Sequence, residues 1–110
     1  MTSVSRGLRW KDRRKNRGYL IRLANADDKL GYLAIADWYA SIPQPSAQTE
    51  QEFQAKMTVC MHDLVEKAKR LHPEKRDDFS SIAHEVKEEL ILRIRATRVS
   101  GLRAKHKVGS

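Results

Sequence analysis

The feature that most constrains the fold is a regular apolar pattern between residues 53 and 71. Apolar side chains recur there at steps of three and four, namely Phe53, Met57, Cys60, Met61, Leu64, Ala68 and Leu71. Because an α-helix turns once every ~3.6 residues, this spacing places them on one face. Gln54, Asp63, Glu66, Lys67 and Arg70 take the other face. A helix that buries one face needs packing partners, and the pattern therefore predicts a helical bundle.

A second helix is predicted before this segment. Asn25, Asp27 and Asp28 offer side-chain acceptors for free amide groups at its start. Its inner face carries apolar and aromatic residues at helical spacing, namely Tyr32, Ile35, Trp38, Tyr39 and Ile42. Pro43 and Pro45 stop this helix. Ser46 or Thr49 is then expected to cap the next one, and Thr49 with Glu52 has the spacing of a capping box.

A last helix is predicted after His72-Pro73, starting at Asp77 or Asp78 and ending at Gly101. It is expected to bury Phe79, Ile82, Ala83, Val86, Leu90 and Ile94. A strand over residues 90–95 is the alternative, but a single strand would leave backbone groups unpaired. Residues 10–24 show a weaker inner stripe of Trp10, Leu20, Ile21 and Ala24, with Arg13, Arg14 and Arg17 expected to face outward.

These segments predict an all-α protein, a small three- or four-helix bundle with basic N- and C-terminal segments. The 110 residues are enough for one domain. We expect a basic arm over residues 1–24, which a short helix can occupy, the helical bundle over residues 25–100, and a basic tail over residues 101–110. No apolar run approaches the ~18 residues needed to cross a bilayer, so no membrane span is expected.

The positive charge is concentrated at the two ends of the chain. The net charge is +8, with 22 Lys and Arg against 14 Asp and Glu. Residues 1–24 carry eight basic groups and one acid, residues 25–90 carry eight basic and thirteen acidic groups, and residues 91–110 carry six basic groups and no acid. An acidic centre between two cationic ends predicts a polyanion as partner.

Nucleic acid is the commonest such partner, because arginine binds phosphate in bidentate fashion and each contact releases counterions. We therefore predict a non-enzymatic, nucleic-acid-binding small subunit of a larger nucleoprotein complex, whose acidic middle contacts a neighbouring protein subunit. The expected phosphate contacts are Arg6, Arg9, Lys11, Arg13, Arg14, Lys15, Arg17, Arg22, Arg93, Arg95, Arg98, Arg103, Lys105 and Lys107.

RNA or a single strand is slightly favoured at this point, because arginine outnumbers lysine near both ends and guanidinium planes stack on exposed bases. Trp10 and Tyr19 flank the basic run, where they either stack on bases or dock onto the bundle. Sequence-specific reading of DNA is less well supported, because neither internal connection has the tight turn of a helix-turn-helix.

Several alternatives to nucleic-acid binding remain open. The basic ends would also suit a small regulator or inhibitor, encoded for instance by a mobile element, that acts on an acidic protein surface. Leu90, Leu92 and Val99 lie among arginines as in some interfacial membrane helices. The two ends would otherwise be solvated tails, and the N-terminal one resembles an organelle transit peptide, although its consecutive charges leave no apolar stripe.

No pattern in the sequence predicts catalysis, a metal or a cofactor. His84, Glu85 and Glu88 resemble the helical zinc motif, but the second histidine is missing and a solvated helix face explains them. The acidic pairs at residues 27–28 and 77–78 stand where helices begin, so capping accounts for them. The five glycines fit no phosphate-binding loop. The single cysteine, Cys60, lies on a core-facing position and predicts a reducing compartment, and we expect a cytoplasmic protein.

Overall fold

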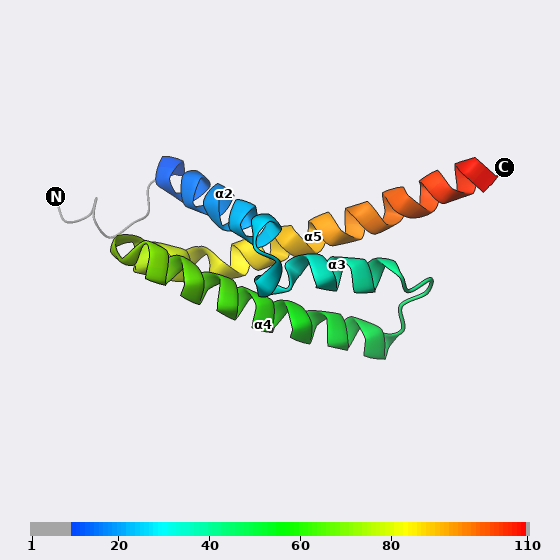
Figure 1. Ribbon diagram of the computed structural model, residues 1–110, viewed down its shortest axis with the longest axis horizontal. Coiled ribbons are helices and arrows are strands. Elements are labelled where there is room, and N and C mark those ends of the chain that lie inside the picture. Colours follow the sequence, from blue (N-terminus) through cyan, green and yellow to red (C-terminus); the bar gives the residue numbers. More distant parts are fainter. Residues whose placement is uncertain (1–9, 110) are drawn as a thin grey trace.

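The part of the chain that the computed structural model describes contains four α-helices and two short 3₁₀ helices (Figure 1). This part comprises the backbone of residues 10–109 and the side chains of residues 12–98. The elements in chain order are α2 (Trp10–Ala26), η1 (Asp28–Leu30), α3 (Tyr32–Ala40), α4 (Ala47–Leu71), η2 (Pro73–Lys75) and α5 (Arg76–Gly109). The predicted all-α class is confirmed, and residues 90–95 are helical within α5.

The starts of α3 and α4 differ in part from the prediction. Asp27 caps η1, accepting a hydrogen bond from the Lys29 amide at 3.0 Å, and Gly31, with φ of 86°, separates η1 from α3. A positive φ of this kind suits glycine, which has no Cβ. The N-cap of α4 is Ser46, whose side chain accepts from the Thr49 amide at 3.1 Å. The predicted capping box at Thr49 is therefore wrong, because Thr49 lies inside α4.

The turn between α4 and α5 follows the prediction more closely. Proline restricts the residue before it, and α4 ends at Leu71, just before His72-Pro73. α5 begins at Arg76 with Asp77 and Asp78 in its first turn, where their charge favours the helix dipole. The expected end at Gly101 is wrong, since α5 continues to Gly109. A glycine inside a helix costs only about 1 kcal/mol relative to alanine, which does not force a break.

The core lies between α4 and α5, with α2 and α3 closing it on two sides (Figure 1). Phe53, Met57 and Leu64 of α4 are fully buried. Phe79, Ile82, Val86 and Leu90 of α5 are also fully buried. The expectation for Leu71 is wrong: it is 53% exposed, because it is the last residue of α4. Val65 and Ile91 are buried in addition to the predicted residues, which shows that both inner faces are wider than one stripe.

Residues 10–24, which we expected to form a basic arm, make up most of α2 and belong to the bundle. Leu20 and Ala24 are fully buried and Ile21 packs against the core, as the weak inner stripe indicated. The side chain of Trp10 lies outside the described residues. Because α2 packs against α3, α4 and α5, its charged residues are held at defined positions on the bundle.

The molecule is elongated, with extents of 61 × 25 × 23 Å, because α5 runs well past the other helices (Figure 1). The start of α2 and the end of α5 lie at opposite ends of the molecule (Figure 1). The backbone of residues 101–109 is therefore far from the first turns of α2. Within the part of the chain that the structure describes, no helix combines the length and the apolar content needed to cross a membrane.

Candidate nucleic-acid interface

Eight of the predicted phosphate-binding residues have described side chains. Arg6 and Arg9 lie outside the described residues, and so do the side chains of Lys11, Arg103, Lys105 and Lys107. The eight that can be placed are Arg13, Arg14, Lys15, Arg17, Arg22, Arg93, Arg95 and Arg98. The structure divides them between two regions of the surface.

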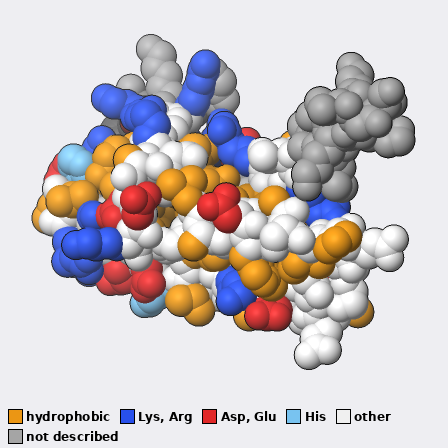
Figure 2. Space-filling view, turned by 45° about the vertical axis from the view of Figure 1, so that its right-hand side comes forward, with side chains coloured by type: hydrophobic (Ala, Val, Ile, Leu, Met, Phe, Trp, Pro, Cys, Tyr) orange, Lys and Arg blue, Asp and Glu red, His pale blue; other side chains and the backbone are white. Residues whose placement is uncertain are grey.

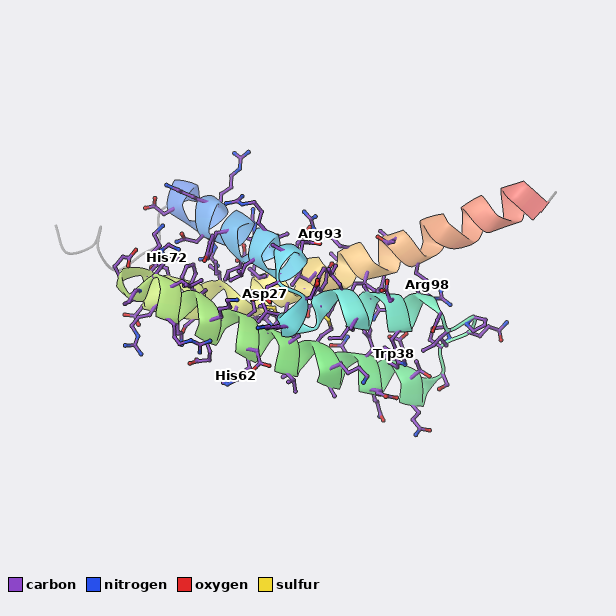
Figure 3. All side chains as sticks on the ribbon, viewed as in Figure 1. Asp27, Trp38, His62, His72, Arg93 and Arg98 are labelled. Atoms are coloured by element: carbon purple, nitrogen blue, oxygen red, sulfur yellow. The ribbon has the colours of Figure 1, made fainter. Side chains whose placement is uncertain are left out.

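Five of these eight residues line one groove between α2 and α5, which we call the basic groove. It has a volume of about 630 Å³, and its lining consists of Arg14, Lys15, Arg17, Gly18, Ile21, Arg22, Glu89 and Arg93. In Figure 2, lysine and arginine side chains gather along the upper edge of the molecule, at the height of α2. Figure 3 shows Arg93 on the side of α5 that faces α2. Cations from the two predicted basic regions thus meet at one site.

The basic groove continues along α2 into a second depression of about 480 Å³. This depression shares Gly18, Ile21, Arg22 and Arg93 with the groove and adds Asn25 and Ala26. From Arg14 to Ala26, α2 rises by about 18 Å at ~1.5 Å per residue. The combined groove is therefore long enough to follow a polymer rather than to enclose a small anion.

Gly18 forms part of the floor of the groove. A Cβ atom added at this position would lie 3.3 Å from Nη1 of Arg22, so the Arg22 side chain folds back over the glycine. Arg22 is exposed and lines both depressions. The missing side chain at residue 18 thus leaves room for a guanidinium at the centre of the combined groove.

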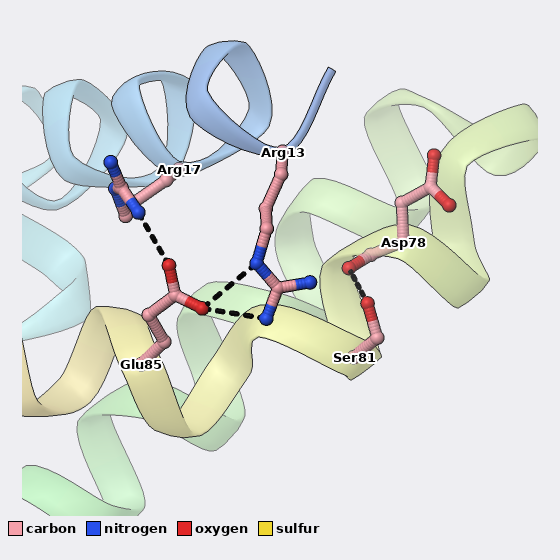
Figure 4. A network of polar contacts seen from close by, with 5 residues as sticks. All are labelled: Arg13, Arg17, Asp78, Ser81 and Glu85. Carbon is pink, nitrogen blue, oxygen red and sulfur yellow. Dashed lines mark hydrogen bonds and ion pairs between the residues drawn. The ribbon is translucent and has the colours of Figure 1, made fainter. Parts of the chain in front are cut away.

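We had expected Arg13 and Arg17 to face outward. Both side chains instead turn toward α5. Arg13 donates to Oε1 of Glu85 at 2.7 and 3.1 Å, and Arg17 donates to Oε2 at 2.5 Å (Figure 4). These hydrogen bonds, first from Arg17 and then from Arg13, lower the pKa of Glu85. All three side chains are about a third exposed. Glu85 therefore ties α2 to α5 along one wall of the groove.

Glu89 and Arg93 form the α5 side of the groove. Arg93 donates from Nε to Oε2 of Glu89 at 3.1 Å, one helical turn away. Glu85, Glu89 and Arg93 are spaced by four residues, so they form one stripe of α5. Glu89 is the one acid among the residues described as lining the groove, which leaves the groove with a clear excess of positive charge.

Arg95 and Arg98 lie on another side of α5, where they bond to α3, to α4 and to the connection between them. Arg95 donates to the Tyr39 hydroxyl at 3.0 Å and to Glu50 at 2.9 Å, and Tyr39 donates to Glu50 at 2.5 Å. The hydrogen bond from Tyr39 is the main cause that lowers the pKa of Glu50. Arg98 donates to the carbonyl oxygens of Ile42 and Pro43. The structure therefore does not bring these two arginines to the basic groove.

Tyr19 docks onto the bundle, which was the second of the two roles that we considered for it. Its ring stacks on Phe79 with a centroid distance of 5.7 Å and contacts His72 edge-on at 5.0 Å. Phe79 is fully buried, so this stacking fixes the Tyr19 ring against the core. Tyr19 consequently does not line the basic groove.

The cysteine and the zinc-like motif, which lie outside the groove lining, are held by burial or by ion pairs. Cys60 is 2% exposed, and burial together with the charge of Asp63 raises the pKa of its thiol to about 11. Glu85 of the zinc-like motif is engaged by two arginines. Among the residues with described side chains, no three His, Cys, Asp or Glu residues come together as a metal site would require.

Comparison with known proteins does not add to this description. No protein-family model, no curated protein and no solved structure matches the chain. The function is therefore argued from the geometry and charge of the groove.

Proposed function

We propose that this protein is a non-enzymatic, nucleic-acid-binding subunit of a larger nucleoprotein assembly. It would hold the phosphate backbone in the basic groove between α2 and α5. The observation that supports this proposal is that five cations from two distant parts of the chain line one elongated groove, with Glu89 as the acid among them. Guanidinium groups and lysine ammonium groups are the side chains that bind phosphate oxygens most strongly.

The position of these cations on helices supports the same proposal. Arg14, Lys15 and Arg22 are exposed on α2, and α2 is anchored to the core by Leu20 and Ala24. Glu85 holds Arg17 from the other wall. Because the backbone that carries these charges is already ordered in a helix, binding loses less backbone freedom than it would on a mobile arm, so more of the electrostatic attraction appears as affinity.

The acidic middle of the chain supports a protein neighbour within the assembly. Asp28, Asp37 and Asp63 are exposed on η1, α3 and α4, away from the lining of the basic groove. We assign these exposed acids to contact with another subunit, while the groove faces nucleic acid. Such a division would use both signs of charge that the sequence separates.

Two measurements test this function. Filter binding of labelled oligonucleotides at about 50 mM salt should give a saturable complex, and the complex should weaken steeply as salt rises toward about 200 mM. Affinity purification of the protein from its native cells, with and without nuclease, should recover nucleic acid that nuclease removes. A lack of oligonucleotide binding, together with a protein partner that resists nuclease, would support the regulator considered from the sequence instead.

A further inference from the structure

We infer that the basic groove is built for the backbone of a duplex rather than for a single strand. This inference rests on the proposed function and specifies the class of nucleic acid that the groove takes. It reverses the slight preference for a single strand that the sequence suggested. Three features of the described residues carry it.

The first feature is the lack of an aromatic ring among the residues described as lining the groove. Single strands without sequence preference are held by stacking, which contributes roughly 5- to 150-fold in affinity per base. Tyr19 is stacked on Phe79, and Trp38 lies on α3 with Lys56 Nζ 5.0 Å from its ring centroid. The groove itself offers Gly18 and Ile21 between its charges. It therefore provides phosphate contacts and no aromatic stacking platform among its described lining residues.

The second feature is the fixed spacing of the cations. Arg14 and Arg22 lie on one rigid helix, about 12 Å apart along its axis at ~1.5 Å per residue. Arg93 approaches from the second wall. A duplex presents phosphates at regular positions before it binds, whereas a flexible strand must be ordered to match the cations. The rigid array thus favours the ligand whose charges are already in place.

The third feature is the predominance of charged side chains in the lining. The size of the duplex preference that follows from phosphate contacts can be worked out. Each phosphate contact changes the salt slope by about 0.9 for a duplex and about 0.7 for a single strand. The salt slopes differ by about 0.2 per contact. With equal non-electrostatic contributions to the two complexes, this difference makes the duplex bind about 1.6-fold more tightly per contact at about 100 mM salt. For three to five contacts, the expected preference for the duplex is about four- to tenfold.

The test compares four probes of one sequence: single-stranded DNA, duplex DNA, single-stranded RNA and duplex RNA. Fluorescence anisotropy with the full-length protein at about 100 mM salt should show each duplex bound about four- to tenfold more tightly than its single strand. The relative affinities of the two duplexes identify the source of the backbone. Equal or tighter binding of the single strands overturns the inference and leaves the proposed function standing. Failure to bind any probe refutes the proposed function as well.

Two variants connect the result to the groove. Arg14→Gln, Lys15→Gln and Arg22→Gln combined leave at most two of the five lining cations and should reduce the duplex preference to about 2.5-fold or less. A preference that stays at the wild-type value would place the duplex on another surface and overturn the inference. Trp10→Ala should leave the preference unchanged. If wild type prefers single strands and Trp10→Ala removes that preference, the inference is overturned, and stacking of bases on Trp10 explains the binding.

Discussion

Replacing Arg14, Lys15 and Arg22 with glutamine removes three positive charges from the basic groove and leaves the core intact. All three side chains are exposed on α2, outside the buried set. If each contacts one phosphate of a duplex, the slope of log Kobs against log salt becomes less steep by about 2.7. Between about 50 and 200 mM salt, wild type should then lose about 40-fold more of its affinity than the variant.

The measurement is a salt series of binding curves on duplex DNA for wild type and variant. A matched control carries Lys29→Gln, Arg70→Gln and Arg76→Gln, which remove the same three charges from exposed positions outside the groove lining. The control should keep the wild-type slope within about 0.5, because none of its three residues is among those described as lining the groove, and the slope depends on the number of phosphates contacted. Circular dichroism of each protein checks that the helices are intact.

The comparison of the two variants decides the outcome. If both lower the slope equally, net charge rather than the groove determines binding. If the groove variant keeps the full wild-type slope, the phosphates lie elsewhere and the proposed interface is refuted. The difference between the variants is informative even if residues outside the described part of the chain add contacts, because those contacts are common to all three proteins.

Three further predictions concern the folded chain. Hydrogen bonds from Arg17 and Arg13 lower the pKa of Glu85, so the ionised carboxylate stabilises the fold above about pH 4.5, and this stabilisation is lost as the pH falls through the lower pKa of the folded state. Between pH 6 and pH 3, the urea midpoint of Glu85→Gln should therefore fall less than that of wild type. Identical pH profiles would contradict this. Cys60, with a pKa of about 11, should react with a thiol reagent at about pH 8 much more slowly in the native protein than in guanidinium, and fast native labelling would contradict its burial. Gly18→Ala should raise the free energy of unfolding by about 0.5–1 kcal/mol, because alanine is the better helix former and the exposed Arg22 side chain can move slightly to admit the new Cβ; a fall in melting temperature would contradict this.

The helices and most of the core could be predicted from local pattern. The steps of three and four between residues 53 and 71 correctly assigned Phe53, Met57 and Leu64 to the core, because amphipathic periodicity is a property of one segment. The helix ends were harder to predict. Ser46 and Thr49 are both good caps, and the sequence alone did not choose between them.

The sequence could have predicted that the basic residues of α5 lie on different sides of the helix, and we did not use this information. Successive residues of a helix are rotated by about 100°, so Arg93 and Arg95 point in nearly opposite directions. They could not both face α2. Arg93 accordingly lines the groove, and Arg95 bonds to Tyr39 and Glu50. The stripe of Glu85, Glu89 and Arg93 at intervals of four would have indicated the face that meets α2.

The sequence by itself determined the all-α bundle and the separation of charge along the chain, because apolar period and composition depend only on the order of residues. Tertiary structure alone decided which cations remain available to a ligand. Glu85 reaches Arg13 across 72 positions in the chain and Glu50 reaches Arg95 across 45, and only packing brings such groups to within about 3 Å of one another. A charge is free or satisfied according to what a neighbouring helix places beside it, and local sequence does not contain that neighbour.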